Sequence, residues 1–438
     1  MTGSPTVLLL ATIGITVLLA PALALFFGGR PDRRRRRVIA AAIPGTMLIA
    51  TTAWMLLGST LGVAAFQGAL AATAVAVILA VGLRTGLVRG YAIFVALWIV
   101  LVLVPVGYSL FDVVRGPLAT SFGTLDFGGV SILALCTGTA ALAISLVSRG
   151  LGNAVGGPPD RSRRAFAFSA GVALLGWLAV DIGAELVIDA TTLTLAVNEL
   201  WAALAGLVGW TIAQIVNVHR ATLAGLVAGI FAGSIVVLPA SPWLDTTAVV
   251  VLGLVAGILG HVAAAAARRS GVGMWATMVG VCLVPGAIGL IGAGIVARGT
   301  GLVFSGHVDL LAAQAAGLGI VVGYSFVITL IIAVLVNRAI GLVGSSGHVD
   351  ETIARLYDEI NAGDIDAVGA RLHPDAQWAP ELMQTGAVLT PVRSRRVRGG
   401  WIEVDVLAGE TSLTHAYTER AGLFDRMESR QALPAVSR

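Results

Sequence analysis

The stretch FGTLDFGGVSILALCTGTAAL, from Phe122 to Leu142, decides how the rest of the chain is interpreted. Asp126 stands at the start of a long apolar run. Burying a charge in lipid is costly, so an ionisable residue beside such a run marks a candidate functional site. Gly128, Gly129 and Gly138 allow a second helix to approach closely. We therefore expect a helix at the centre of a helical membrane protein.

Composition supports this class. The chain has 438 residues, of which 57% are hydrophobic and 12% charged, whereas soluble domains carry roughly 25% charged residues. The basic residues are all arginines, and the high pI comes largely from arginines in loops, so the positive charge does not indicate a nucleic-acid partner. Cys136 and Cys282 both lie within apolar runs and form no disulfide or metal-ligand pattern. We expect no cofactor, no bound metal and no enzyme activity, since no phosphate loop, catalytic triad or zinc signature is found.

Eleven runs approach the roughly 20 apolar residues that a spanning helix needs. They are residues 6–28, 38–60, 64–83, 91–111, 127–148, 165–188, 192–216, 221–240, 246–267, 273–297 and 308–336. We expect the first run to be a retained helix, because it exceeds signal-peptide length and lacks a small-residue cleavage site.

Arginines fall in alternate loops of this arrangement. Those after odd-numbered runs include the block Arg33 to Arg37, whereas the other loops hold only Arg115 and Arg298. Loops rich in arginine stay in the cytoplasm. The pattern predicts a multi-pass protein of the cell membrane with its N-terminus outside and its C-terminus in the cytoplasm. The Arg33 to Arg37 block is interpreted as a topology signal beside anionic lipid.

The composition becomes polar after residue 340. We divide the chain into a transmembrane domain, 1–340, and a cytoplasmic tail, 341–438. The tail begins with a helical pattern that includes Ile353, Leu356, Tyr357 and Ile360. A strand-like alternation follows at 400–409. Its first thirty residues resemble the opening of a SnoaL-like domain, which implies a partial α+β fold.

Several motifs resemble the ammonium transporter/Rhesus (Amt/Rh) family. Seven residues of the first stretch agree with the family's fifth helix: Asp126, Phe127, Gly129, Gly138, Ala140, Ala141 and Leu142. Motifs similar to its first, third, ninth and eleventh helices are ALFFGG at 24–29, FQG at 66–68, GLVAGILG at 253–260 and GYSFVIT at 323–329. The resemblance covers all eleven runs. It implies an all-α bundle with an inverted repeat of runs one to five and six to ten, assembled as a homotrimer with one conduit per protomer.

The resemblance also implies which positions line the pore and its outer vestibule. Family members place two histidines, from the fifth and tenth helices, in a narrow apolar conduit. In this chain those positions carry Ala134 and Cys282, while the family's aspartate and one tryptophan are kept as Asp126 and Trp177. The other gate and vestibule positions carry Leu70, Val114, Val180, Asp181 and Ala184.

Two acidic residues suggest an alternative outer site. Asp181 and Glu185 are four residues apart and share a helix face. They either form a cation or proton site in the vestibule, or Glu185 and Asp189 simply lie near the outer end of the helix. Glu199 lies at the same level, and we expect it to be structural or interfacial. His261 is expected to pack against its neighbours and not to line a pore.

These features predict a membrane protein of the ammonium transporter family, acting as a channel for ammonium, ammonia or another small neutral solute. Neither Ala134 nor Cys282 exchanges a proton near neutral pH as imidazole does, so we expect no electrogenic ammonium transport. One alternative is a non-transporting sensor or scaffold that signals through the C-terminal tail. Another is a channel for a different substrate that uses Asp181 and Glu185. Membrane lipids are expected partners, and family members also bind PII-type regulators at the cytoplasmic face, although this tail departs from the usual short one.

Overall fold

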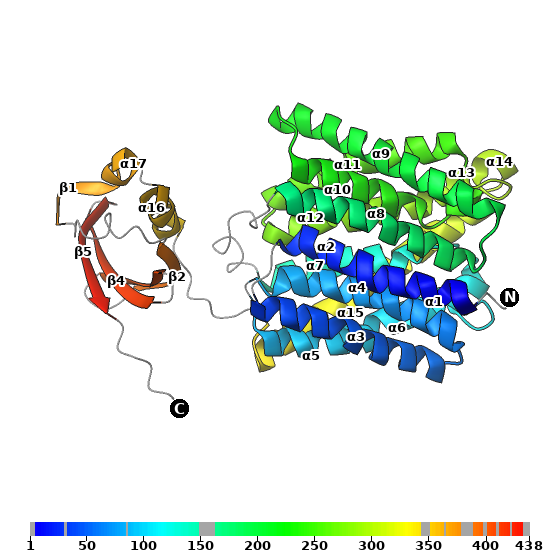
Figure 1. The fold of residues 1–438 in the computed structure, drawn as a ribbon, viewed down its shortest axis with the longest axis horizontal. Helices are drawn as coiled ribbons and strands as arrows, with labels where there is room; N and C mark the ends of the chain where they lie inside the picture. The colour runs from blue at the N-terminus through cyan, green and yellow to red at the C-terminus, as the bar shows by residue number, and fades with distance from the viewer. Residues whose placement is uncertain are drawn as a thin grey trace. The chain divides into compact units, whose positions relative to one another are not determined.

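A computed structural model describes residues 5–29, 33–84, 86–148, 163–342, 351–362, 365–377, 389–396, 401–408, 411–420 and 423–431. Contacts between residues divide the chain into two units. One contains residues 1–149 and 157–342, and the other contains residues 150–156 and 343–438. The first unit is helical, and its main helices lie side by side along a common direction (Figure 1).

The helices of the first unit are α1 (Pro5–Gly14), α2 (Ala20–Gly28), α3 (Arg33–Leu56), α4 (Leu61–Gly82), α5 (Val88–Trp98), α6 (Val104–Phe111), α7 (Cys136–Val147), α8 (Arg163–Glu185), α9 (Ala190–Val218), α10 (Leu223–Val237), α11 (Thr246–Arg269), α12 (Ala276–Met278), α13 (Val284–Val296), α14 (Leu302–Ser305) and α15 (Asp309–Ala339). Turns of π-helix join several of them into longer helices: Ile15–Leu19, Ile99–Leu103, Ser131–Leu135 and Val279–Leu283. A further π-helical turn, Leu118–Phe122, and two 3₁₀ turns, Ser241–Trp243 and Gly273–Trp275, lie between helices.

The helical unit matches the expected membrane class. Among the described residues, nine helical segments are long and apolar enough to cross a membrane, and two apolar helices, Ser131–Val147 and Leu223–Val237, are shorter. The predicted run 127–148 loses its first residues because the backbone at 123–129 is not helical. Gly129 has a φ of +75°, which only glycine adopts without strain. The eleven-span arrangement itself stays a prediction.

Two helices cross at the centre of the unit through small residues. A Cβ atom built on Gly138 of α7 would lie 2.6 Å from the Cβ of Leu283. One built on Gly286 of α13 would lie 2.9 Å from Cδ2 of Leu135. The π-helical turns Ser131–Leu135 and Val279–Leu283 contact each other at this crossing. Helix–helix contacts in membranes rely on such small residues because lipid gives little hydrophobic drive to association.

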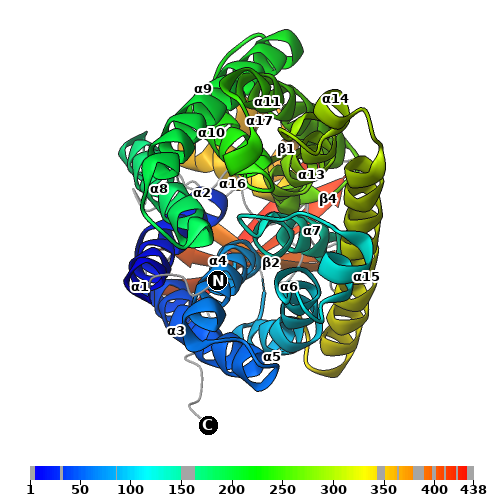
Figure 2. The same cartoon turned by 90° about the vertical axis from the view of Figure 1, so that its right-hand side faces the viewer.

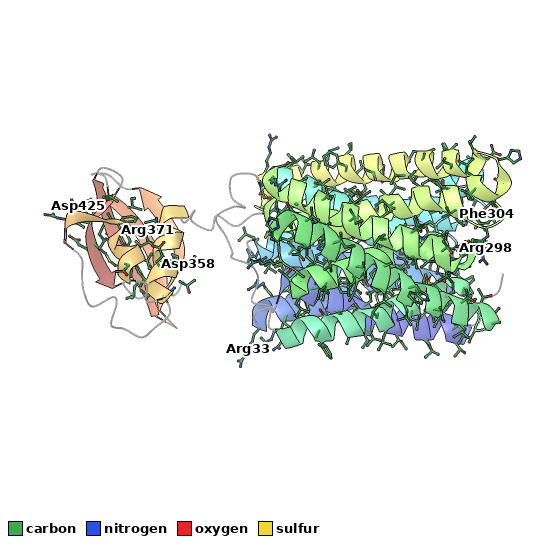
Figure 3. The ribbon with its side chains drawn as sticks, turned by 90° about the horizontal axis from the view of Figure 1, so that it is seen from above. Arg33, Arg298, Phe304, Asp358, Arg371 and Asp425 are labelled. Carbon is green, nitrogen blue, oxygen red and sulfur yellow. The ribbon has the colours of Figure 1, made fainter. Side chains whose placement is uncertain are left out.

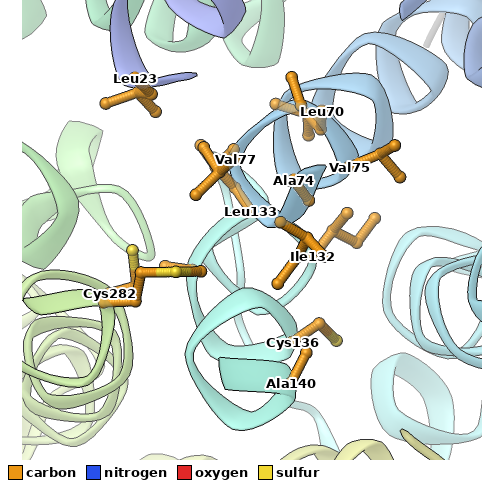
Figure 4. Packing of buried hydrophobic residues seen from close by; sticks show 14 of the residues in the cluster. Leu23, Leu70, Ala74, Val75, Val77, Ile132, Leu133, Cys136, Ala140 and Cys282 are labelled. Carbon is orange, nitrogen blue, oxygen red and sulfur yellow. The ribbon is translucent and has the colours of Figure 1, made fainter. Parts of the chain in front are cut away.

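Helix α4 forms the other side of this core and is the most completely buried of the nine long segments. In Figure 4 its side chain Val77 lies near Leu133, and Cys282 lies on a separate segment of the chain. Figure 2 views the unit along its helices, with α15 on one side and α1 and α3 on the other.

Charged side chains mark the two ends of the helical unit. Figure 3 shows Arg33 at one end and Arg298 at the opposite end. Arg298 lies 3.9 Å from the carboxylate of Asp245. Arg33 belongs to the arginine-rich block, and Arg298 belongs to a loop that is poor in arginine. One end of the unit therefore carries an arginine-rich loop, and the opposite end carries an arginine-poor loop.

The C-terminal unit combines helices and a sheet. Its elements are α16 (Glu351–Ala362), α17 (Ile365–Gly369), β1 (Leu372–Gln377), β2 (Leu389–Arg396), β3 (Trp401–Ala408), β4 (Thr411–Arg420) and β5 (Leu423–Gln431). The sheet has the order β1-β5-β4-β3-β2; β1 pairs with β5 in parallel, and the other pairs are antiparallel. The predicted helix and strand are confirmed as α16 and β3, whereas the resemblance to a SnoaL-like domain stays a prediction.

The core of this unit contains a polar cluster. Ile353 and Leu356 of α16 pack with inward-facing residues of the sheet. Beside them, the hydroxyl of Tyr357 lies 2.6 Å from that of Tyr417 and contacts Nδ1 of His415. Burial lowers the pKa of His415 to about 4, so its ring is neutral at physiological pH. Neutral groups of this kind can be buried at little cost when they bond to each other.

Candidate functional site

A cavity of about 560 Å³ opens at one end of the helical unit. Its wall combines α1, α4 and α6, the non-helical segment 123–127, the end of α8 and the turn at Trp243. The lining is mostly apolar, with Asp126 and Gln67 among its few polar side chains. Concave, mainly apolar cavities with a few polar groups are the usual form of small-molecule sites.

Asp126 fixes the floor of this cavity. Its side chain is 8% exposed. Oδ1 accepts a hydrogen bond from the backbone N–H of Val130 at 2.8 Å, and Oδ2 accepts one from Ser131 at 2.9 Å. These are the first residues of the helix that continues into α7, so the carboxylate satisfies N–H groups that have no partner within the helix. The contacts match the capping role expected for this aspartate.

We expect Asp126→Ala to lower the thermal stability of the purified protein. Loss of an N-cap side chain costs about 0.5–2 kcal/mol, and here two buried N–H groups lose their acceptor. Thermal unfolding in detergent measures the change. Asp309→Ala is the matched control, because Asp309 is an exposed acidic residue in the first turn of α15. Equal melting temperatures for the two variants would refute the capping role.

The cavity also contains groups that the sequence did not single out. Phe127 and Trp243 form an edge-to-face pair with ring centroids 5.8 Å apart, and both line the cavity together with Phe111. Gln67 is 3% exposed and its Oε1 has no hydrogen-bond partner among the described residues. The motif FQG points to Gln67, but no sequence signal links Trp243, which lies in the distant segment SPW, to this cavity.

Leu70 is the residue predicted for the gate, and this role stays a prediction. Its side chain is fully buried. Its Cδ1 atom lies so near Gly129 that a Cβ there would be only 2.6 Å away, and the ring of Phe111 is close to the same glycine. The aliphatic Leu70 side chain therefore closes the space over the start of the central helix.

The expected histidine positions lie in the two π-helical turns that contact each other. Ala134 belongs to Ser131–Leu135 and is fully buried. Cys282 belongs to Val279–Leu283 and is 4% exposed. Cys282 is a free thiol. Neither residue brings an imidazole to the crossing, so the structure brings the two turns together without the proton-exchanging groups of the family's conduit.

The remaining residues predicted for the pore and vestibule differ in their exposure to solvent. Trp177 and Val180 of α8 are fully buried, and Ala184 lines the cavity near the end of the same helix. Val114 is different, because it is 79% exposed and its neighbour Val113 lines the cavity instead.

The acidic residues of α8 have different surroundings. Glu185 accepts a hydrogen bond from the hydroxyl of Thr192 at 2.7 Å. Asp181 of α8 and Glu199 of α9 are both buried. Asp181 and Glu185, the pair considered from the sequence, therefore differ in burial, since Glu185 is only partly buried.

His261 is buried by packing, as expected. Its ring makes an edge-to-face contact with Trp210 at a centroid distance of 5.5 Å. Nε2 lies 3.3 Å from the amide nitrogen of Asn217. These contacts on α9 and α11 involve none of the cavity residues.

Known proteins are similar to this chain in both sequence and fold. Residues 24–351 match the model of the Ammonium Transporter Family. The chain is 28% identical over 294 residues to a putative ammonium transporter of Methanothermobacter thermautotrophicus, covering 64% of this chain and 69% of that protein. It is 24% identical over 371 residues to ammonium transporter Amt1 of Archaeoglobus fulgidus, covering 77% and 93%. The crystal structure of Candida albicans Mep2 is similar in fold, with a TM-score of 0.67 at 21% identity over 76% of this chain and 84% of that one.

Proposed function

Because the chain belongs to the ammonium transporter family, we propose that it is a channel for ammonia or another small neutral solute. The cavity of about 560 Å³ is its outer vestibule. The conduit passes the gate position at Leu70 and continues along the crossing of the two π-helical turns. Asp126 holds the backbone at the entrance through its two hydrogen bonds.

One observation carries the proposal that the passing molecule is neutral. The turns Ser131–Leu135 and Val279–Leu283 contact each other, and they contain Ala134 and Cys282, the positions at which the family resemblance implies imidazoles. An ion that enters an apolar passage must lose its water, and without polar partners that step is prohibitive. The free energy needed to remove water from ammonia on the same path is far smaller, because ammonia carries no charge.

The vestibule contains groups that can attract the ammonium ion before this ion releases a proton. The aromatic side chains of Phe127 and Trp243 pack edge to face and both line the cavity. A cation over an aromatic face gains about 0.5–1 kcal/mol when exposed, and more when desolvated. The free Oε1 of Gln67 supplies a hydrogen-bond acceptor deeper in the wall. These groups take the place of the aromatic residue that the family has at Val114.

We also propose the family arrangement for the whole helical unit. The nine long segments and two shorter apolar helices become eleven spans, in which runs one to five and six to ten form an inverted repeat. The matching π-helical turns before α7 and α13 support this repeat, since each lies in the fifth helix of its half. The unit assembles as a homotrimer in the cell membrane, surrounded by lipid. Residues 341–438 form a cytoplasmic domain of partial SnoaL-like type, and a PII-type regulator is a candidate partner at that face.

The charge distribution predicts orientation. Arg33 and Arg298 mark opposite ends of the helical unit, and arginine-rich loops face the cytoplasm. A small epitope inserted at Gly306, in a loop at the arginine-poor end, should bind antibody on intact cells. The same epitope fused after Arg438 should bind only after permeabilisation. Antibody binding to the C-terminal epitope on intact cells would overturn the orientation.

The function itself is tested by flux. Purified protein in liposomes should speed the uptake of radiolabelled methylammonium relative to protein-free liposomes, and unlabelled ammonium should compete. Asp309→Asn, at an exposed site that does not line the cavity, serves as the control variant. Uptake no faster than in protein-free liposomes would favour the alternative, a sensor or scaffold that signals through the C-terminal domain. Uptake that requires Asp181 and Glu185 would favour a channel for a different substrate.

A further inference from the structure

A second cavity, of about 270 Å³, lies between α2 and α3 and is called the α2–α3 groove below. It shares no lining residue with the vestibule cavity. Both helices pack against α4, whose Ala80 forms part of the lining. A Cβ atom built on Gly28 of α2 would lie only 2.5 Å from the carbonyl oxygen of Ala80. This tight contact between α2 and α4 closes the groove on its inner side.

The lining is charged at one end and apolar along the rest. Arg35 and Arg36 lie in the first turn of α3, at the end of the helical unit that carries Arg33 (Figure 3). The apolar part consists of Ile39, Ala40 and Ile43 of α3, Pro21, Ala24, Leu25, Gly28 and Gly29 at and after α2, and Ala80. At 1.5 Å per residue, the wall from Arg35 to Ile43 is about 12 Å long. No acidic side chain of the described residues lines the groove.

The groove is open on the side that faces lipid. Pro21 of α2 and Ala40 of α3 line it and are both exposed. They belong to Thr6–Gly28 and Arg35–Leu56, two of the segments that are long and apolar enough to cross a membrane. Arg35 begins the second of these segments, so the charged end of the groove lies at the level of lipid headgroups and the apolar part lies at the level of acyl chains.

This distribution of charge fits one class of ligand. Arginine binds phosphate oxygens through paired hydrogen bonds, and basic pockets between membrane helices bind anionic headgroups. A soluble anion would use the two arginines but would leave the apolar wall without a partner. A zwitterionic lipid would bring its own positive group next to both guanidinium groups. An anionic phospholipid matches the charged end and the apolar wall together.

We propose that the α2–α3 groove binds one anionic phospholipid, with the phosphate at Arg35 and Arg36 and the start of one acyl chain along Ile39 and Ile43. This assigns a discrete lipid to two of the five arginines in the block, beyond the general attraction of a basic loop to an anionic membrane surface. The bound lipid joins α2 to α3 and stabilises their packing, whether or not the protein conducts ammonia.

Thermal unfolding of the full chain in detergent tests the site. Phosphatidylglycerol and phosphatidylcholine with the same acyl chains are added at increasing mole fraction, and sodium phosphate is added in a third series. Only phosphatidylglycerol should raise the melting temperature with a saturable dependence, because a ligand that binds the folded state stabilises it. Equal rises with the two lipids would contradict recognition of an anionic headgroup. An equal rise with sodium phosphate would show that an anion alone is bound and would overturn the lipid proposal.

Two double variants of α3 distinguish the groove from the rest of the arginine-rich block. Arg35→Gln with Arg36→Gln removes the charges that line the groove. Arg33→Gln with Arg37→Gln removes the same charge from exposed residues that do not line it. The first pair should raise the half-saturating mole fraction of phosphatidylglycerol by about fivefold for each arginine, and the second pair should raise it much less. Equal weakening in the two double variants would contradict the proposal.

Added bulk tests the apolar part at constant charge. Ala40→Trp fills the groove from an exposed position, and Ala41→Trp places the same side chain at an exposed neighbour that does not line it. Phosphatidylglycerol should no longer raise the melting temperature of Ala40→Trp, whereas Ala41→Trp should respond like the wild type. Each variant is compared with itself without lipid, so its starting stability does not affect the result. A full rise in Ala40→Trp would show that the lipid does not lie in the groove.

Discussion

Liposomes that contain the protein should give no ammonium-dependent current on a solid-supported membrane. The two π-helical turns at the centre offer Ala134 and Cys282 and no imidazole. A thiol exchanges protons poorly near neutral pH because its ordinary pKa is about 8.5. Neither of these two side chains can therefore relay a proton behind the substrate, and the ion itself cannot shed its water there. The expected signal is that of protein-free liposomes, measured with ammonium pulses against pulses of sodium.

An ammonium-dependent current would contradict this prediction. A robust current that persists in Cys282→Ala would show that charge crosses without the central thiol. If that current disappears in Asp181→Asn, the carboxyl group of Asp181 would be part of the charge pathway. Either result would refute the electroneutral conduit, even if the family assignment stood.

The variant Gly138→Ala should strongly destabilise the helical unit. Its new methyl group would lie 2.6 Å from the Cβ of Leu283 and 2.7 Å from that residue's backbone nitrogen. The obstruction includes backbone, so the two central helices must move apart. Overpacking of this kind costs about 1–3 kcal/mol. A marked fall in melting temperature in detergent is the expected result.

Gly323 of α15 provides the matched control. A Cβ atom at this position would meet nothing within 4 Å. Replacing a helical glycine with alanine at an open site gains about 0.5–1 kcal/mol, so Gly323→Ala should unfold at the same temperature or higher. If Gly138→Ala were as stable as Gly323→Ala, the tight crossing of α7 with the segment before α13 would be wrong.

Much of the fold can be predicted from local sequence patterns, which require no knowledge of contacts between distant residues. Apolar runs of spanning length overlap every main helix of the first unit, and the family resemblance drawn from motifs is confirmed. The start of the central helix was placed a few residues early, because run length does not register the cap at Asp126 or the positive φ of Gly129.

Less of the candidate site can be predicted from the sequence. Position-by-position comparison with the family identifies Ala134 and Cys282 but does not reveal substitutes that arise elsewhere in the chain. Trp243 reaches the cavity from a turn between α10 and α11. The sequence predicts a structural or interfacial role for Glu199, and the burial of its side chain depends on how α9 packs against its neighbours. Such contacts between distant segments leave no periodic signal in a single sequence.

The sign of the internal pH change during ammonium entry tests the central claim most directly. Liposomes loaded with a pH-sensitive dye are mixed rapidly with ammonium chloride in a stopped-flow instrument. Ammonia that enters takes up a proton inside, so the account predicts that the lumen becomes alkaline faster with the protein than without it, independently of an imposed membrane potential. Entry of the ammonium ion adds charge and no alkalinity. Acidification of the lumen, or a rate that follows the imposed potential, would contradict passage of the neutral molecule.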